Sequence, residues 1–103
     1  MKTDKLKKLL EKTGYPVAYD HFIYPQLLPY IAYLRDQSRN FSADNRVYYK
    51  ADSYRIELYT AQKDQEAEKK IENLLDEAGI YYDAYESWID GEKMFMVMYL
   101  IMM

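Results

Sequence analysis

The sequence predicts a two-layer α+β domain, with two helices packed on a largely antiparallel sheet. Apolar residues recur at three-and-four spacing in two separate segments, which is the period of a helix. In the remaining segments they alternate with polar residues or form short β-prone runs, as strands do. The predicted order is helix, three strands, helix and two strands. We expect residues 1–103 to form a single domain, because a chain of this length buries roughly two-thirds of its unfolded surface.

The composition is that of a soluble, packed protein. The chain is 50% hydrophobic and 30% charged with a formal net charge of -3, so we expect no specificity for nucleic acid. It has no cysteine, which excludes disulfides and thiolate metal ligands. The longest apolar run, residues 94–103, is about half of the roughly 20 residues that span a bilayer. The first ten residues also lack the apolar core of a signal peptide. We therefore expect neither membrane insertion nor secretion.

The N-terminal segment predicts a short helix over residues 3–13. Its leucines fall on one face, lysines occupy most of the rest, and Gly14 follows as a C-terminal stop. Alternating residues over 17–22 then predict the first strand. Prolines bracket the next connection, after which the β-prone run 30–35 predicts a brief second strand.

Residues 36–45 form a polar stretch with one large apolar residue, Phe41, and predict the longest loop of the chain. Residues 47–60 are β-prone and predict the third strand, with Ile56 on the face that points to the core. Residues 51–53 within it are compatible with a bulge in one bent strand or with the tip of a hairpin.

The second helix is predicted to run from an N-terminal cap at Asp64 to Ala78, with Gly79 ending it. Its apolar positions follow helical spacing: Ala67, Ile71, Leu74, Leu75 and Ala78. Residues 80–89 and 94–101 then flank Asp90-Gly91, a dipeptide that favours the positive φ angles of a tight two-residue turn. The chain is thus predicted to end in a β-hairpin.

No pattern in the sequence indicates catalysis. The only histidine, His21, has no cysteine and only Asp20 as a near neighbour that could join it at a metal site or in a triad. The glycines form no phosphate-binding or nucleophile motif, and the carboxylates of residues 64–77 alternate with lysines as on a solvated helix face. We therefore expect no enzymatic activity, no catalytic residues, no metal and no cofactor.

The last predicted strand is apolar on both faces. Met96 and Met98 lie on one face and Tyr99 and Ile101 on the other, so one face stays open unless another chain or the first helix covers it. Methionine's flexible thioether suits adaptable contacts, and the chain is rich in tyrosine, with thirteen of them. The candidate interface residues are Phe41, Met96, Met98, Tyr99 and Ile101.

Most of the chain resembles the small tail-completion proteins encoded in the head-to-tail joining gene cluster of phages and prophages, including tail terminators. The matching segments are Pro16-Val17-Ala18-Tyr19, Tyr30-Ile31-Ala32-Tyr33, Phe41-Ser42-Ala43-Asp44-Asn45, Tyr54-Arg55-Ile56-Glu57-Leu58-Tyr59-Thr60 and the helix start at Lys63-Asp64. The chain also resembles, in the same general way, the head-closure proteins of this gene cluster. The resemblance implies structural residues only, and no catalytic or cofactor-binding ones.

The resemblance implies a virion assembly protein that self-associates as a ring, caps the tail tube and meets the head connector. Such a protein would be found in the bacterial host cytoplasm during assembly and then in the virion tail. Two alternatives remain open. A small-molecule-sensing domain would need a pocket with polar groups converging between sheet and helices, and a host-directed inhibitor of prophage origin would bind one bacterial target.

Overall fold

The computed structural model describes residues 2–36 and 52–103. The elements follow the order α1 (Lys2–Glu11), β1 (Val17–Tyr19), β2 (Tyr30–Arg35), β3 (Ser53–Thr60), α2 (Gln65–Glu77), β4 (Tyr82–Ile89), a 3₁₀ turn η1 (Asp90–Glu92) and β5 (Met94–Met102). The predicted α+β class and the predicted order of helices and strands are therefore confirmed.

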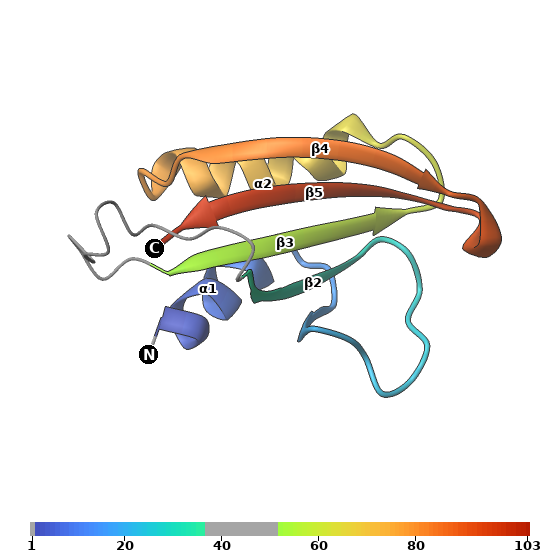
Figure 1. Ribbon diagram of the computed structural model, residues 1–103, viewed down its shortest axis with the longest axis horizontal. Helices are drawn as coiled ribbons and strands as arrows, with labels where there is room; N and C mark the ends of the chain where they lie inside the picture. The colour runs from blue at the N-terminus through green and yellow to red at the C-terminus, as the bar shows by residue number, and fades with distance from the viewer. Residues whose placement is uncertain (1, 37–51) are drawn as a thin grey trace, which may run out of the picture.

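The strands form one sheet in the order β1-β2-β3-β5-β4 (Figure 1). β1 pairs with β2 in parallel, and the other neighbours pair antiparallel. The last strand, β5, lies between β3 and β4, so the C-terminal hairpin packs against the middle of the sheet. The two edges differ in length, because β1 has 3 residues and β4 has 8.

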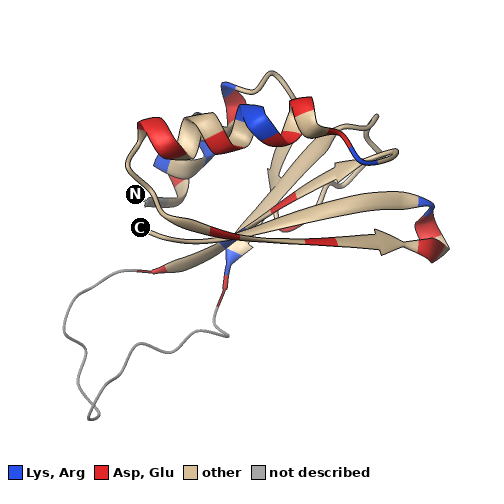
Figure 2. Ribbon diagram, turned by 90° about the horizontal axis from the view of Figure 1, so that it is seen from above, with Lys and Arg blue, Asp and Glu red and all other residues tan. Residues whose placement is uncertain are grey.

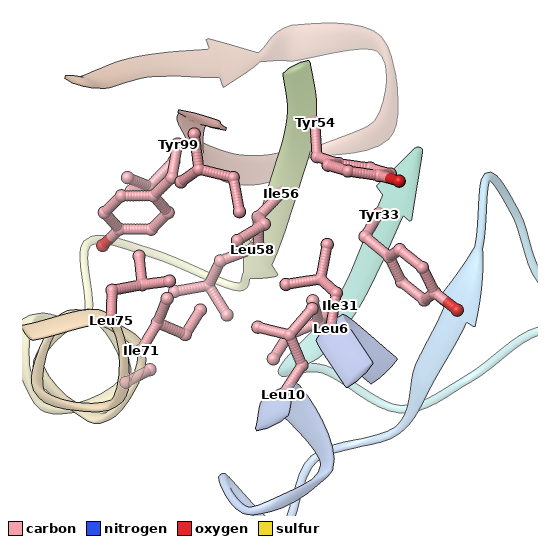
Figure 3. Packing of buried hydrophobic residues seen from close by; sticks show 13 residues of the cluster. Leu6, Leu10, Ile31, Tyr33, Tyr54, Ile56, Leu58, Ile71, Leu75 and Tyr99 are labelled. Atoms are coloured by element: carbon pink, nitrogen blue, oxygen red, sulfur yellow. The ribbon is translucent and has the colours of Figure 1, made fainter. Parts of the chain in front are cut away.

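Both helices lie on the same side of the sheet (Figure 2). The hydrophobic core fills the space between them and the sheet (Figure 3). α1 contributes Leu6 and Leu10, while Ile56 and Leu58 reach the core from β3, as the alternation in that strand predicts. The opposite face of the sheet carries no helix of the described chain.

α2 begins where the sequence predicts. The Asp64 carboxylate accepts a hydrogen bond from the Ala67 backbone N–H at 3.1 Å, which satisfies one of the unpaired donors at the helix start. Ala67, Ile71 and Leu75 are fully buried. Leu74 is only half-buried and Ala78 is exposed, so the buried stripe is narrower than predicted. Leu74 is rotated about 100° from Leu75, and Ala78 lies beyond the last helical residue, at the C-terminal cap of α2.

Removing the cap should destabilise the domain. We expect Asp64→Ala to lower the free energy of unfolding by about 1 kcal/mol, because the Ala67 N–H loses its acceptor. Asp64→Asn is the matched control, since an asparagine oxygen caps about as well. Urea unfolding followed by circular dichroism measures both variants, and equal midpoints for Asp64→Ala and the wild type would show that this cap contributes nothing.

Four predictions about strands and connections need correction or fall partly outside the described chain. β1 ends at Tyr19 rather than at residue 22, because Asp20 takes a positive φ of 66° and turns the chain away. The hairpin turn spans residues 90–93 and its positive φ, 53°, belongs to Lys93 rather than to Asp90-Gly91. Of the predicted loop 36–45, only Asp36 is described, and residues 47–51 of the predicted third strand also lie outside the described residues.

No helix in residues 2–36 and 52–103 combines the length and the hydrophobicity needed to cross a membrane.

Candidate protein interface

The sheet face opposite the helices carries a row of apolar side chains on β5, the strand between β3 and β4. We call this row the methionine stripe, and it consists of Met94, Met96, Met98, Leu100 and Met102. All five side chains are half-buried. The first helix does not cover them, because α1 and α2 both pack on the other face (Figure 2). Of the two arrangements that the sequence left open, the described chain adopts the one in which this face has no helix.

A polar row on β3 runs beside the methionine stripe. Arg55, Glu57 and Tyr59 pair across the strands with Leu100, Met98 and Met96, in that order. The Tyr59 hydroxyl donates to Glu57 Oε1 at 2.8 Å, and Arg55 Nε lies 3.0 Å from Glu57 Oε2, without the alignment of a hydrogen bond. Burial raises the pKa of Tyr59 most, and the Glu57 carboxylate raises it further.

The open face is therefore amphipathic. The Glu57 carboxylate pairs with Arg55 and accepts a hydrogen bond from Tyr59. A partner that covers the face therefore does not bury an unpaired charge. Apolar rows flanked by polar and charged groups are typical of protein interfaces, which are not more hydrophobic overall than the rest of a protein surface.

The predicted interface residues divide between the two sheet faces. Met96 and Met98 lie on the open face. Tyr99 and Ile101 belong to the hydrophobic core, because successive strand residues point to opposite faces and these two point toward the helices. Tyr99 is 0% exposed, and its hydroxyl donates to Glu72 Oε2 on α2 at 2.9 Å. Phe41 lies outside the described residues.

The outer strand of the hairpin, β4, is an edge strand of the described sheet and carries exposed aromatic side chains. Tyr85 and Trp88 are 50% and 48% exposed, and Tyr81, just before the strand, is 79% exposed. Lys63 forms ion pairs with both β4 and the start of α2, because its Nζ lies 2.7 Å from Glu86 Oε2 and 2.8 Å from Glu68 Oε2. An exposed edge of this length is a template on which another chain can add a strand. We call β4 together with the methionine stripe the hairpin surface.

A second apolar surface lies on the connection between β1 and β2, residues 20–29. Ile23, Tyr24 and Leu27 are 85%, 76% and 88% exposed, and several exposed apolar side chains on one segment indicate a contact surface where a single one would not. Figure 1 shows this connection on the side of the sheet opposite β4. The sequence does not predict this surface, because its prolines indicate a connection and its apolar residues follow neither a helical nor a strand period.

A hollow of about 480 Å³ lies on the open face, between the β1–β2 connection and the sheet. Its walls include Asp20, Phe22, Tyr30, Ala32, Tyr59 and Glu92. The pocket expected for a small-molecule sensor would lie between sheet and helices, whereas this hollow lies on the opposite face. His21 also lines it, with Nδ1 3.1 Å from the Asp20 carboxylate. Within the described ranges, no three His, Cys, Asp or Glu side chains are grouped to hold a metal ion.

The fold and these surfaces define a small α+β protein with two apolar surfaces, which lie toward opposite edges of one sheet. Comparisons of the chain with known protein families, curated proteins and solved structures find no match. We therefore infer function from the surfaces themselves.

Proposed function

We propose that the protein is a structural assembly subunit that joins copies of itself head to tail. The observation that supports this role is the placement of its two apolar surfaces, the hairpin surface and the β1–β2 connection, toward opposite edges of the sheet. A head-to-tail contact needs two different surfaces on each subunit, and it closes into a ring when the rotation between neighbours permits.

The resemblance to phage tail-completion proteins gives this role a place in a virion. A ring of such subunits caps the tail tube, fixes its length and offers a surface to the head connector. Its subunits form in the bacterial host cytoplasm and end in the virion tail. The role is mechanical and needs neither a cofactor nor catalysis.

The lengths of the two edge strands limit how neighbouring subunits can contact each other. β4 has 8 residues and β1 has 3, so pairing β4 of one subunit with β1 of the next would leave most of β4 unpaired. A head-to-tail contact therefore uses side chains, with Ile23, Tyr24 and Leu27 of one subunit packed on the hairpin surface of its neighbour. The rival arrangement pairs two β4 edges about a two-fold axis and stops at a dimer.

Two lysine substitutions test the head-to-tail arrangement. Tyr85→Lys places a charge on the hairpin surface, and Leu27→Lys places one on the connection; both positions are exposed, so the monomer should stay folded. We expect the wild type to associate with rising concentration and each variant to remain monomeric, because burying an unpaired ammonium opposes the contact. Light scattering across concentrations measures the mass.

Mixing the two variants separates the possible symmetries. Each retains one intact surface, so a head-to-tail contact predicts a one-to-one heterodimer that grows no further, whereas a two-fold contact through β4 predicts that Leu27→Lys dimerises alone. Asn73→Lys on the exposed side of α2 is the control for added charge and should associate like the wild type. A wild type that stays monomeric up to about 1 mM would contradict self-association.

A further inference from the structure

Aromatic rings form one wall of the hollow on the open face. Phe22 and Tyr30 meet with ring centroids 5.4 Å apart and planes at 79°, so two ring faces stand nearly at right angles. Tyr30 also stacks on Tyr59, with centroids 5.1 Å apart and planes at 30°. The three rings come from the β1–β2 connection, β2 and β3. An aromatic face carries negative charge density, which attracts cations.

Two carboxylates stand around the same hollow. Asp20 lines it from the connection and Glu92 from the turn between β4 and β5. Glu92 forms no ion pair within the described chain, whereas the Asp20 carboxylate lies 3.1 Å from His21 Nδ1. No lysine or arginine lies among the described lining residues. Burial raises the pKa of Tyr30, and the charge of Glu92 raises it further, which places that negative charge within electrostatic reach of the rings. The hollow thus has an aromatic wall and a negative rim.

We propose that this hollow binds an organic cation, an alkylammonium or guanidinium group, between the rings of Phe22, Tyr30 and Tyr59 and the carboxylates of Asp20 and Glu92. The rings provide cation–π attraction, and the carboxylates neutralise the charge. A volume of about 480 Å³ is within the range of small-molecule sites, and it is large enough for such a group with part of the molecule that carries it.

The group has two possible sources, a free small molecule or a basic side chain of a partner protein. Either one meets the same rings and carboxylates. The hollow is formed within one subunit, so its binding does not depend on the head-to-tail assembly proposed above. The experiment is therefore made at concentrations at which the protein is monomeric.

Titration with choline, followed by backbone amide chemical shifts, tests the inference. Its uncharged isostere 3,3-dimethylbutan-1-ol has the same shape and is the matched ligand control. We expect choline to shift the amides around Tyr30, Tyr59 and Glu92 and to bind about tenfold more tightly than the isostere. Acetyl-arginine amide and an arginine-containing peptide distinguish the two sources, because a partner's side chain predicts tighter binding of the peptide than of either small cation.

Glu92→Gln removes one rim charge at an exposed turn position and should weaken choline binding about fivefold without changing the fold. Glu77→Gln, exposed at the end of α2, changes the net charge equally and should leave binding unchanged. The proposal is overturned if choline and its isostere bind equally, if the shifted amides lie away from the hollow, or if both glutamine variants behave alike. A failure of self-association would leave these expectations intact.

Discussion

Leu75→Ala is expected to lower the free energy of unfolding by about 2 to 5 kcal/mol. Leu75 is 0% exposed and lies on α2 in the same buried cluster as Ile71 and Leu58 (Figure 3). Truncation to alanine removes the contacts of the leucine side chain with its buried neighbours. It also leaves a cavity that the neighbouring helix and strand fill only partly. A loss of this size is a large fraction of the stability of a small domain, which is usually 5–15 kcal/mol.

Leu74→Ala is the matched control for that substitution. The same atoms are removed one position earlier, where the side chain is half-buried and outside the core cluster. We expect a loss below about 1.5 kcal/mol, because less apolar surface returns to water and solvent fills the space. Chemical unfolding of both variants measures the difference. Equal losses would mean that α2 is rotated about its axis relative to the sheet.

Local patterns in the sequence were sufficient to locate most helices and strands. Asp64 and Gly79 bracket α2, because an N-terminal cap and a glycine with positive φ are local signals that do not depend on the rest of the fold. The alternation in β3 likewise predicted that Ile56 points inward. Such signals act over a few residues, so one sequence is enough to read them.

The faces of β5 could not be assigned in the same way. Both of its faces are apolar, so periodicity gave no indication of which one meets the helices. The assignment follows from pairing: β5 lies between β3 and β4, with Tyr99 opposite Ile56. That pairing joins segments distant along the chain, and no local pattern encodes it. The sequence therefore does not reveal that Tyr99 and Ile101 point into the core, whereas Met96 and Met98 lie on the open face.

The apolar β1–β2 connection and the hollow beside it were not predicted. Residues 22–28 contain large apolar side chains without a helical or strand period, and the prolines around them indicate only that regular structure is interrupted. The contact of Phe22 with Tyr30 depends on how this connection folds back over the sheet. Its path is set by tertiary packing rather than by local propensity.

Aspartate substitutions at two adjacent positions of β5 should have opposite effects. Tyr99→Asp is expected to unfold the domain, with a cost above about 4 kcal/mol, because it places a charge in the core beside the carboxylate that Tyr99 now contacts, Glu72. Met98→Asp replaces a half-buried side chain on the open face, so the domain should stay folded. Circular dichroism and the dispersion of amide resonances distinguish a folded from an unfolded chain.

The same pair of variants tests the hairpin surface. Met98→Asp should remain monomeric at concentrations where the wild type associates, because a partner would have to bury the new carboxylate. Its cross-strand neighbour is Glu57, and the repulsion between the two carboxylates should cost up to about 1 kcal/mol of stability. Met98→Lys removes that repulsion, since its ammonium faces Glu57, and should still prevent association. If both Met98 variants are folded and both associate like the wild type, the methionine stripe does not take part in the contact.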